Sequence, residues 1–156
     1  TVYYLAKTAY RNDAPGRNIR NILFTNSTYA DDAKANEVYA EWEAAGFTEE
    51  KFIELNSLYN EDSSIVNGGL YENVQEGQMV PEFNDWMFDS SRKTGDHGIV
   101  ETTYGWHIMY YVGESEYAAW QAEALAALQQ NDYTKMVEQY AAGNTFNNNA
   151  MYMINA

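Results

Sequence analysis

Along residues 17–24, side chains alternate in a way that is typical of a β-strand. Ile19, Asn21 and Leu23 occupy every second position, so they share one face of the strand, and the residues between them share the other. We therefore predict a strand here, with one polar asparagine on a face that is otherwise apolar.

Two helices are predicted after this strand. From residue 30 to residue 45 the apolar positions recur at helical spacing, and Gly46 follows where a left-handed helix cap would lie. Thr48 can then cap a second helix, whose first turn carries Glu49 and Glu50, and these charges suit the helix dipole. The apolar positions of the two helices are Ala35, Val38, Tyr39, Trp42 and Ala45, followed by Phe52, Leu55, Leu58 and Tyr59.

The next segment, residues 60–78, is polar and contains turn-forming glycines around a short apolar piece near Tyr71 and Val74. A third, short helix is predicted to start at Pro81, because proline suits the first helical position, where its missing N–H costs nothing. The residues expected along one side of this helix are Phe83, Trp86 and Met87.

A β-hairpin is predicted towards the end of this region. Residues 99–102 and 106–112 are rich in β-forming side chains, and residues 103–105 between them suit a turn. His107 lies in the second of these strands. His97 falls in the loop before the hairpin, and we assign it no role.

The predicted order of strand, two helices, short strand, helix and two strands indicates an antiparallel α+β domain. Beyond it, one helix is predicted to be capped by Ser115 and another by Asp132, with Gly143 at its end. The apolar tail at residues 151–154 could add a strand beside residues 1–10. The expected division of the chain is a flanking segment at residues 1–16, the α+β domain at residues 17–113, and a helical extension with its tail at residues 114–156.

Composition and charge exclude several classes of function. The chain has 9 Lys and Arg against 23 Asp and Glu, and this formal charge of -14 repels nucleic-acid phosphates and anionic membranes. It has no cysteine and only two histidines, His97 and His107, so no metal or other cofactor is expected. No run approaches the roughly 20 apolar residues of a membrane span. A cysteine-free domain rich in Tyr, Asn and acidic residues suits an exported protein of an organism that seldom uses disulfides, although reducing compartments also permit it. We expect an extracytoplasmic location.

Several motifs between residues 18 and 113 occur in a fixed order and together resemble one known family. These motifs are Arg20-Asn21-Ile22-Leu23-Phe24, Tyr59-Asn60-Glu61-Asp62, Gly68-Gly69, the segment from Glu76 to Phe83, the segment from Gly98 to Thr102, and the segment from Tyr104 to Ile108. In sequence and spacing they resemble the parvulin family of peptidyl-prolyl cis–trans isomerases. The resemblance implies a four-stranded antiparallel sheet wrapped by helices, with a substrate groove on the open face of the sheet.

The resemblance also implies the residues of a site. Met79 and Phe83 would form an apolar pocket for the proline ring of a substrate, and the polar groups would lie beside it. The implied substrate-binding residues are Met79, Phe83, Tyr71, Val74 and Gln78, and the implied catalytic residues are Asp62, His107, Thr102 and Asn21.

Each of these residues also has a purely structural interpretation. Met79 and Phe83 could belong to the core, and His107 could be a hydrogen-bonded histidine that orients the sheet. Asp62 could be a turn residue that accepts bonds from local N–H groups.

One departure from the family concerns the first strand. The family usually has a histidine directly after the arginine of this strand, where this chain has Asn21. Asparagine can exchange hydrogen bonds with His107 but cannot titrate, so we expect the network to survive in reduced form. Tyr71-Glu72 also replaces a common Leu-Gly pair at the rim of the pocket.

The function implied by the resemblance is prolyl isomerisation that assists the folding of exported, proline-containing polypeptides. The alternative is a catalytically weak, parvulin-like module that binds unfolded clients. The phosphate-specific members of the family carry a basic cluster after the first strand, whereas residues 25–32 of this chain hold no Lys or Arg. We therefore predict no preference for phosphopeptides.

Overall fold

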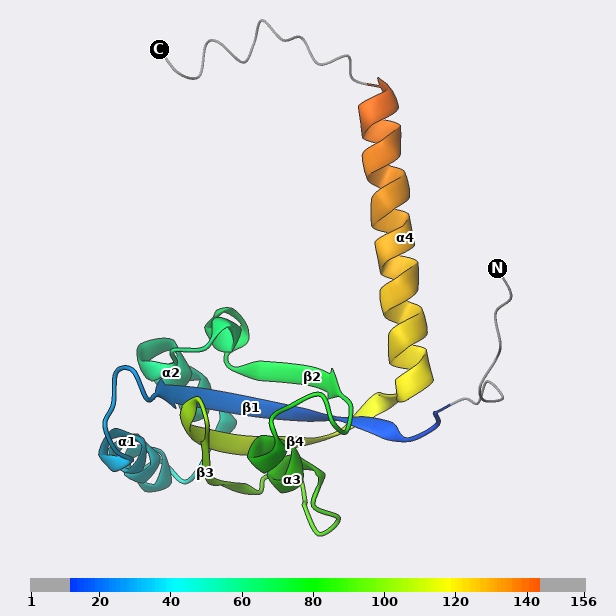
Figure 1. The fold of residues 1–156 in the computed structure, drawn as a ribbon. Coiled ribbons are helices and arrows are strands. Elements are labelled where there is room, and N and C mark those ends of the chain that lie inside the picture. Colours follow the sequence, from blue (N-terminus) through cyan, green and yellow to red (C-terminus); the bar gives the residue numbers. More distant parts are fainter. Residues whose placement is uncertain (1–11, 144–156) are drawn as a thin grey trace, which may run out of the picture. The chain divides into compact units, whose positions relative to one another are not determined.

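The fold is described by a computed structural model that covers residues 12–143 (Figure 1). Four strands form one antiparallel sheet in the order β2-β1-β4-β3, which confirms the predicted α+β fold. The strands are β1 (Pro15–Thr25), β2 (Leu70–Val74), β3 (His97–Thr102) and β4 (Gly105–Ala118). The helices are α1 (Ala33–Ala44), α2 (Glu49–Tyr59), α3 (Pro81–Phe88) and α4 (Ala119–Gly143), with the short 3-10 helix η1 (Ser63–Asn67) after α2.

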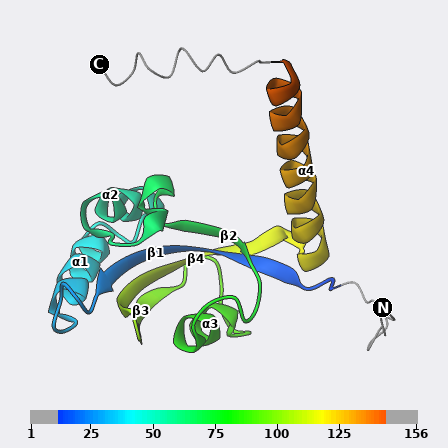
Figure 2. The same cartoon turned by 45° about the horizontal axis from the view of Figure 1, so that its top comes forward.

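Helices cover both faces of the sheet (Figure 2). On one face, Ile22 and Phe24 of β1 pack with α1 and α2 around the buried Trp42. On the other face, Ile19 of β1 packs with α3, mainly through Met87. The period-2 pattern of the sequence thus divides β1 between two cores, as a strand in the middle of a sheet requires.

Local signals in the sequence explain how the predicted helices begin and end. The Thr48 side chain accepts a hydrogen bond from the Lys51 backbone N–H and caps α2, as predicted. Gly46 follows α1 with a φ of 77°, in the left-handed region that favours glycine. Pro81 occupies the first turn of α3, which confirms the predicted start of that helix.

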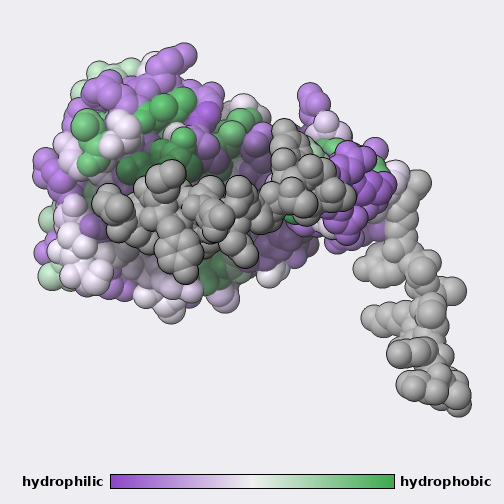
Figure 3. Space-filling view, turned by 90° about the horizontal axis from the view of Figure 1, so that it is seen from above, coloured by the Kyte–Doolittle hydropathy of each residue, from purple (hydrophilic) through white to green (hydrophobic). Residues whose placement is uncertain are grey.

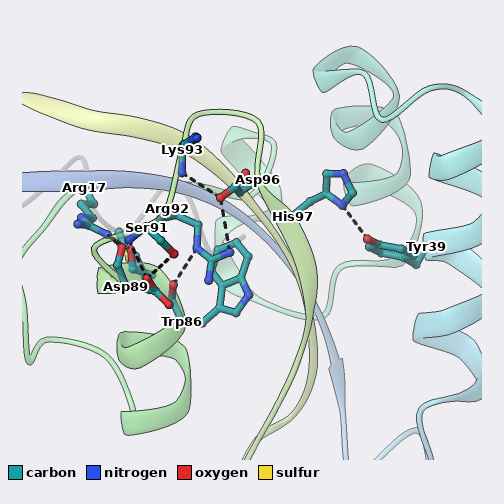
Figure 4. Close-up of polar contacts among 10 residues, drawn as sticks. Arg17, Tyr39, Trp86, Asp89, Ser91, Arg92, Lys93, Asp96 and His97 are labelled. Carbon is teal, nitrogen blue, oxygen red and sulfur yellow. Dashed lines mark hydrogen bonds and ion pairs between the residues drawn. The ribbon is translucent and has the colours of Figure 1, made fainter.

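Two arginines hold the C-terminal end of α3, as Figure 4 shows. Arg17 of β1 donates to the carbonyl oxygens of Met87 and Asp89. Arg92 donates to the Trp86 carbonyl oxygen at 3.1 Å and stacks on the indole ring at 3.8 Å. The last carbonyls of a helix lack partners within the helix, and both arginines supply donors to them. The bonds from Arg17 also anchor α3 to β1.

The prediction of two C-terminal helices was wrong. Ser115 lies in β4, which runs on to Ala118 and pairs with the start of β1, so it caps no helix. A single helix, α4, then extends to Gly143 without a break at Asp132. The residues after Gly143 lie outside the described part of the chain, so the predicted helix end there stays a prediction.

The placement of His97 in a loop was also wrong. It is the first residue of β3, its Nδ1 atom lies 2.6 Å from the Tyr39 hydroxyl, and its ring stacks on Phe47 at 3.8 Å. His97 therefore ties β3 to α1 (Figure 4), a contact between residues 58 positions apart that local sequence patterns do not reveal.

The chain divides into two compact units, Thr1–Ala119 and Trp120–Ala156. The strand proposed for residues 151–154 and the element expected at residues 1–10 lie outside the described residues. Within residues 12–143, no helix combines the length and the apolar character needed to cross a membrane.

Candidate functional site

A pocket of about 300 Å³ opens on the face of the sheet that carries α3. It is lined by residues from β1, β2, β4, α3 and the loops between elements. They are Asn21, Leu23, Asp62, Tyr71, Gln78, Met79, Val80, Phe83, Tyr104 and His107. A larger and more polar hollow, of about 700 Å³, lies beside Asn84 and Phe88 of α3 and contains none of the predicted site residues.

The apolar wall of the pocket is built by the start of α3. Pro81 begins this helix, so that Met79 and Val80 precede it and Phe83 follows within its first turn. The Phe83 side chain is 3% exposed, and its ring stands edge-on to His107 with the centroids 5.5 Å apart. Phe83 therefore belongs both to the core and to the pocket, and the two interpretations of this residue are compatible.

A chain of hydrogen bonds forms the polar floor. The Tyr104 backbone N–H donates to Thr102 Oγ1 at 3.1 Å, and this oxygen lies 2.8 Å from His107 Nε2. The other ring nitrogen, Nδ1, lies 2.9 Å from Asn21 Oδ1. The predicted network between the two strands is thus present, with asparagine in the place of the first histidine.

His107 is neutral under physiological conditions. Its side chain is 5% exposed, and burial lowers the pKa of the imidazole to about 4, although the Asp62 charge opposes this shift. A neutral imidazole has one N–H and one acceptor nitrogen, so both of its bonds have a defined direction.

Asp62 keeps its negative charge beside this neutral histidine. Burial alone would raise its pKa, but hydrogen bonds from Ser64 and Tyr71 outweigh burial and lower the pKa below the usual value. The Tyr71 hydroxyl donates to Asp62 Oδ1 at 2.6 Å, and burial together with this bond raises the pKa of Tyr71 to about 12. Asp62 Oδ1 also accepts from the Ser64 N–H and caps η1, so the capping interpretation is confirmed for a residue that lines the pocket.

Two buried asparagines fix this part of β1. Asn60 accepts from the Leu23 and Asp62 backbone N–H groups, at 2.9 and 3.0 Å. It also donates to the Asn21 carbonyl oxygen, which accepts a second bond from Asn56 at 3.0 Å. Because β2 pairs with β1 only as far as Arg20, these side chains take the place of a neighbouring strand.

The structure brings together most of the predicted site residues. Val74 is the exception, since it is 4% exposed, packs in the core beneath α3 and does not line the pocket. Thr102 reaches the pocket only through His107.

Sequence analysis missed three lining residues. Leu23 shares a strand face with Asn21, so its position could have been deduced from the period-2 pattern. Val80 and the hairpin residue Tyr104 carry no local signal that predicts their position in the pocket.

Among the described residues, no three His, Cys, Asp or Glu side chains are grouped so that they could hold a metal ion. The side chains of the pocket provide an apolar wall, the Asp62 carboxylate, the neutral His107 imidazole, two side-chain amides and two tyrosine hydroxyls.

A family model and two curated relatives match most of this chain. A family model described as "PPIC-type PPIASE domain" matches residues 3–115. The foldase protein PrsA 1 of Listeria monocytogenes serotype 4b (strain F2365) is 30% identical over an alignment of 132 residues, and the match covers 82% of this chain and 42% of the relative. The chaperone SurA of Pseudomonas fluorescens (strain Pf0-1) is 30% identical over an alignment of 131 residues, and the match covers 78% of this chain and 30% of the relative.

Solved structures of PrsA share the fold. The peptidylprolyl isomerase PrsA from Bacillus anthracis superimposes with a TM-score of 0.54 at 23% identity, covering 77% of this chain and 51% of that protein. PrsA from Bacillus subtilis gives a TM-score of 0.51 at 26% identity, covering 82% of this chain and 45% of that protein. The chain spans less than half the length of the Listeria PrsA 1 and Pseudomonas SurA relatives.

Proposed function

Since the chain belongs to the PPIC-type peptidyl-prolyl isomerase family, we propose that it is an active prolyl isomerase that assists the folding of exported proteins. The observation that carries the proposal is the composition of the pocket. An apolar wall around Met79 and Phe83 faces a buried, hydrogen-bonded floor at Asn21 and His107. This is the arrangement that a proline ring and its amide group need.

Prolyl isomerisation rotates a peptide bond and breaks no covalent bond. A peptide bond resists rotation by about 18–20 kcal/mol because resonance gives its C–N bond partial double-bond character. A catalyst can therefore act by binding the twisted amide better than either planar isomer. Met79 and Phe83 would hold the proline ring, while the polar floor would interact with the twisting amide.

The clients we propose are unfolded, proline-containing polypeptides outside the cytoplasm. In support, the curated relatives are named a foldase and a chaperone, and uncatalysed prolyl isomerisation takes roughly 10–100 s, long enough to delay folding. The absence of cysteine suits this location.

A second function is favoured by one observation. Asn21 occupies the position where the family usually has a histidine, so turnover could have been lost while client binding was kept. Both functions need the pocket, and only the rate of isomerisation separates them.

The decisive experiment is exchange NMR on a short, unphosphorylated Xaa-Pro peptide, with and without the protein. We expect wild type to accelerate cis–trans exchange and Phe83→Ala to abolish the acceleration. Met87→Ala is the matched control, because Met87 is fully buried in the same cluster on the same helix but does not line the pocket. Truncation of such core residues costs about 3–5 kcal/mol, so equilibrium unfolding of each variant is measured in parallel.

The alternative outcomes are distinct. Peptide binding without acceleration, particularly if Asn21→His restores turnover, would support the client-binding module. If Phe83→Ala does not fold, Met79→Ala removes a partly buried part of the same wall and serves as the second variant.

A further inference from the structure

The hydrogen bonds around His107 determine where each proton of the floor lies. Thr102 Oγ1 accepts from the Tyr104 N–H and lies 2.8 Å from His107 Nε2 and 3.4 Å from the Gly105 carbonyl oxygen. Because a hydroxyl has two acceptor lone pairs, these contacts fit either direction of the bond to His107. The direction follows from the other side of the ring, where Asn21 Oδ1 lies 2.9 Å from His107 Nδ1 and, as an amide oxygen, can only accept.

The orientation of Asn21 therefore fixes the tautomer of His107. Since Oδ1 accepts, Nδ1 carries the proton and donates it to Asn21. A neutral imidazole with its proton on Nδ1 accepts at Nε2, so Thr102 is the donor there. The amide nitrogen of Asn21, Nδ2, then points away from His107.

The Asn21 Nδ2 group is a donor at the pocket without a protein partner. Asn21 is 1% exposed and lines the pocket, and no hydrogen bond within the described part of the chain involves its Nδ2 atom. Its backbone carbonyl is held by Asn56 and Asn60, so the residue is fixed from behind. Among the described residues, Asn56 Oδ1 is the one fully buried polar side-chain atom without a partner, so Asn21 Nδ2 keeps contact with the open space of the pocket. There it is available to an acceptor on the bound client.

We propose that Asn21 Nδ2 donates a hydrogen bond to the prolyl nitrogen of the client as the amide twists, with Thr102 and His107 as positioning residues. This inference rests on the proposed isomerase function. In a planar amide the nitrogen lone pair is delocalised into the carbonyl and accepts no bond, whereas twisting localises it on nitrogen. The bond therefore forms only in the twisted state, which is the condition for lowering the barrier.

The tautomer of His107 is the first test, and it needs no variant. Nitrogen-15 NMR of the imidazole in the free protein is expected to show a protonated Nδ1 and an unprotonated Nε2. Thr102→Val removes the hydroxyl donor and is expected to shift the population towards the Nε2–H tautomer. An Nε2–H tautomer in wild type would overturn the inference, because Asn21 would then present its oxygen to the pocket.

The second test is Asn21→Asp, which keeps the acceptor for His107 but replaces the donating NH₂ group with oxygen. We expect kcat for the Xaa-Pro peptide to fall about tenfold while KM stays nearly unchanged, because the planar ground state does not use the donor. Asn26→Asp is the matched control, since it makes the same change at an exposed residue outside the pocket and should keep wild-type kcat.

The outcomes separate this inference from the proposed function. If wild type accelerates exchange and Asn21→Asp keeps its kcat, or loses only in KM, the role of Asn21 is refuted and the isomerase function stands. If wild type gives no acceleration, the isomerase function fails, and donation to the client fails with it.

Discussion

At the scale of single residues, the pocket holds a histidine and an aspartate in opposite states. His107 is buried and Asp62 is partly buried, yet burial leaves the histidine neutral while hydrogen bonds keep the aspartate charged. The difference arises from the partners, because Asp62 receives donors from Ser64 and Tyr71 and the neutral His107 completes a chain of neutral groups. Such divergent pKa values are typical of functional sites.

The depressed pKa of His107 predicts how stability depends on pH. Between about pH 6.5 and pH 4 the unfolded chain binds a proton at this histidine and the folded protein does not, so stability falls as the pH falls through this window. The whole loss is on the order of 3 kcal/mol. Urea unfolding across this pH range measures it.

His107→Gln provides the control for this titration. The variant should lose the part of the pH dependence that belongs to His107, while His97, whose pKa burial also lowers, titrates in both proteins. Equal slopes in wild type and His107→Gln would contradict the assignment.

The residues of the site were easier to predict from the sequence than the buried side chains that hold them in place. Strand alternation placed Asn21 on the face of Ile19 and Leu23, and the family motifs implied a hydrogen bond to His107, which the structure confirms. Asn56 and Asn60 hold the Asn21 carbonyl from α2 and the loop after it, more than 30 positions away. No local pattern distinguishes such side chains from surface asparagines, because only tertiary packing decides where their amides point.

At the scale of elements, the start of β2 must approach β1 very closely. Gly69 has a φ of 76°, and a Cβ atom added there would lie 2.4 Å from both the Asn21 carbonyl oxygen and Asn56 Nδ2. The Asn21 N–H also donates to the Gly69 carbonyl oxygen at 2.9 Å. Glycine at this position thus lets the chain enter β2 while Asn56 and Asn60 hold the same carbonyl.

Gly69→Ala is therefore expected to destabilise the protein strongly, by several kcal/mol, because backbone atoms must move to relieve the contact. Gly46→Ala is the matched control, since Gly46 has nearly the same φ of 77° but open space where the Cβ would lie. That change should cost only about 1 kcal/mol for the unfavourable backbone conformation. Equal losses for the two variants, measured by urea unfolding, would show that steric contact at Gly69 is unimportant.

Element boundaries were predictable where one strong local signal dominated. Pro81 and Thr48 identified the starts of α3 and α2, since each suits a helix N-terminus for a specific geometric reason. Ser115 gave a false signal, because the alternation of buried Ser115 with exposed Glu114 and Glu116 in β4 is set by pairing with β1. Capping residues are common outside helices, so they identify an end only where tertiary structure allows a helix.

At the scale of the whole molecule, a strongly acidic chain carries a pocket that no described Lys or Arg lines. Asp62 is the one charged residue among those that line it, and no Lys or Arg does. Elsewhere in the described chain, Arg20 pairs with Glu49 at 2.7 Å, and Lys34 pairs with Glu37 at 2.9 Å. Figure 3 shows apolar residues gathered next to hydrophilic ones on the unit that carries the sheet. The chain as a whole has a formal net charge of -14.

This charge predicts discrimination against phosphorylated clients. A phosphoserine-proline peptide adds about -2 near Asp62, where no guanidinium or ammonium group can bind it, so its kcat/KM should be lower than that of the unphosphorylated twin. Because screening weakens repulsion between charges near the surface, the difference should shrink as the salt concentration rises. Exchange NMR on both peptides at low and high salt measures this difference in kcat/KM. A second pair of peptides, one with Gln-Pro and one with Glu-Pro, tests the effect of a smaller negative charge. A preference for the phosphopeptide would mean that a cationic group outside the described pocket binds the phosphate.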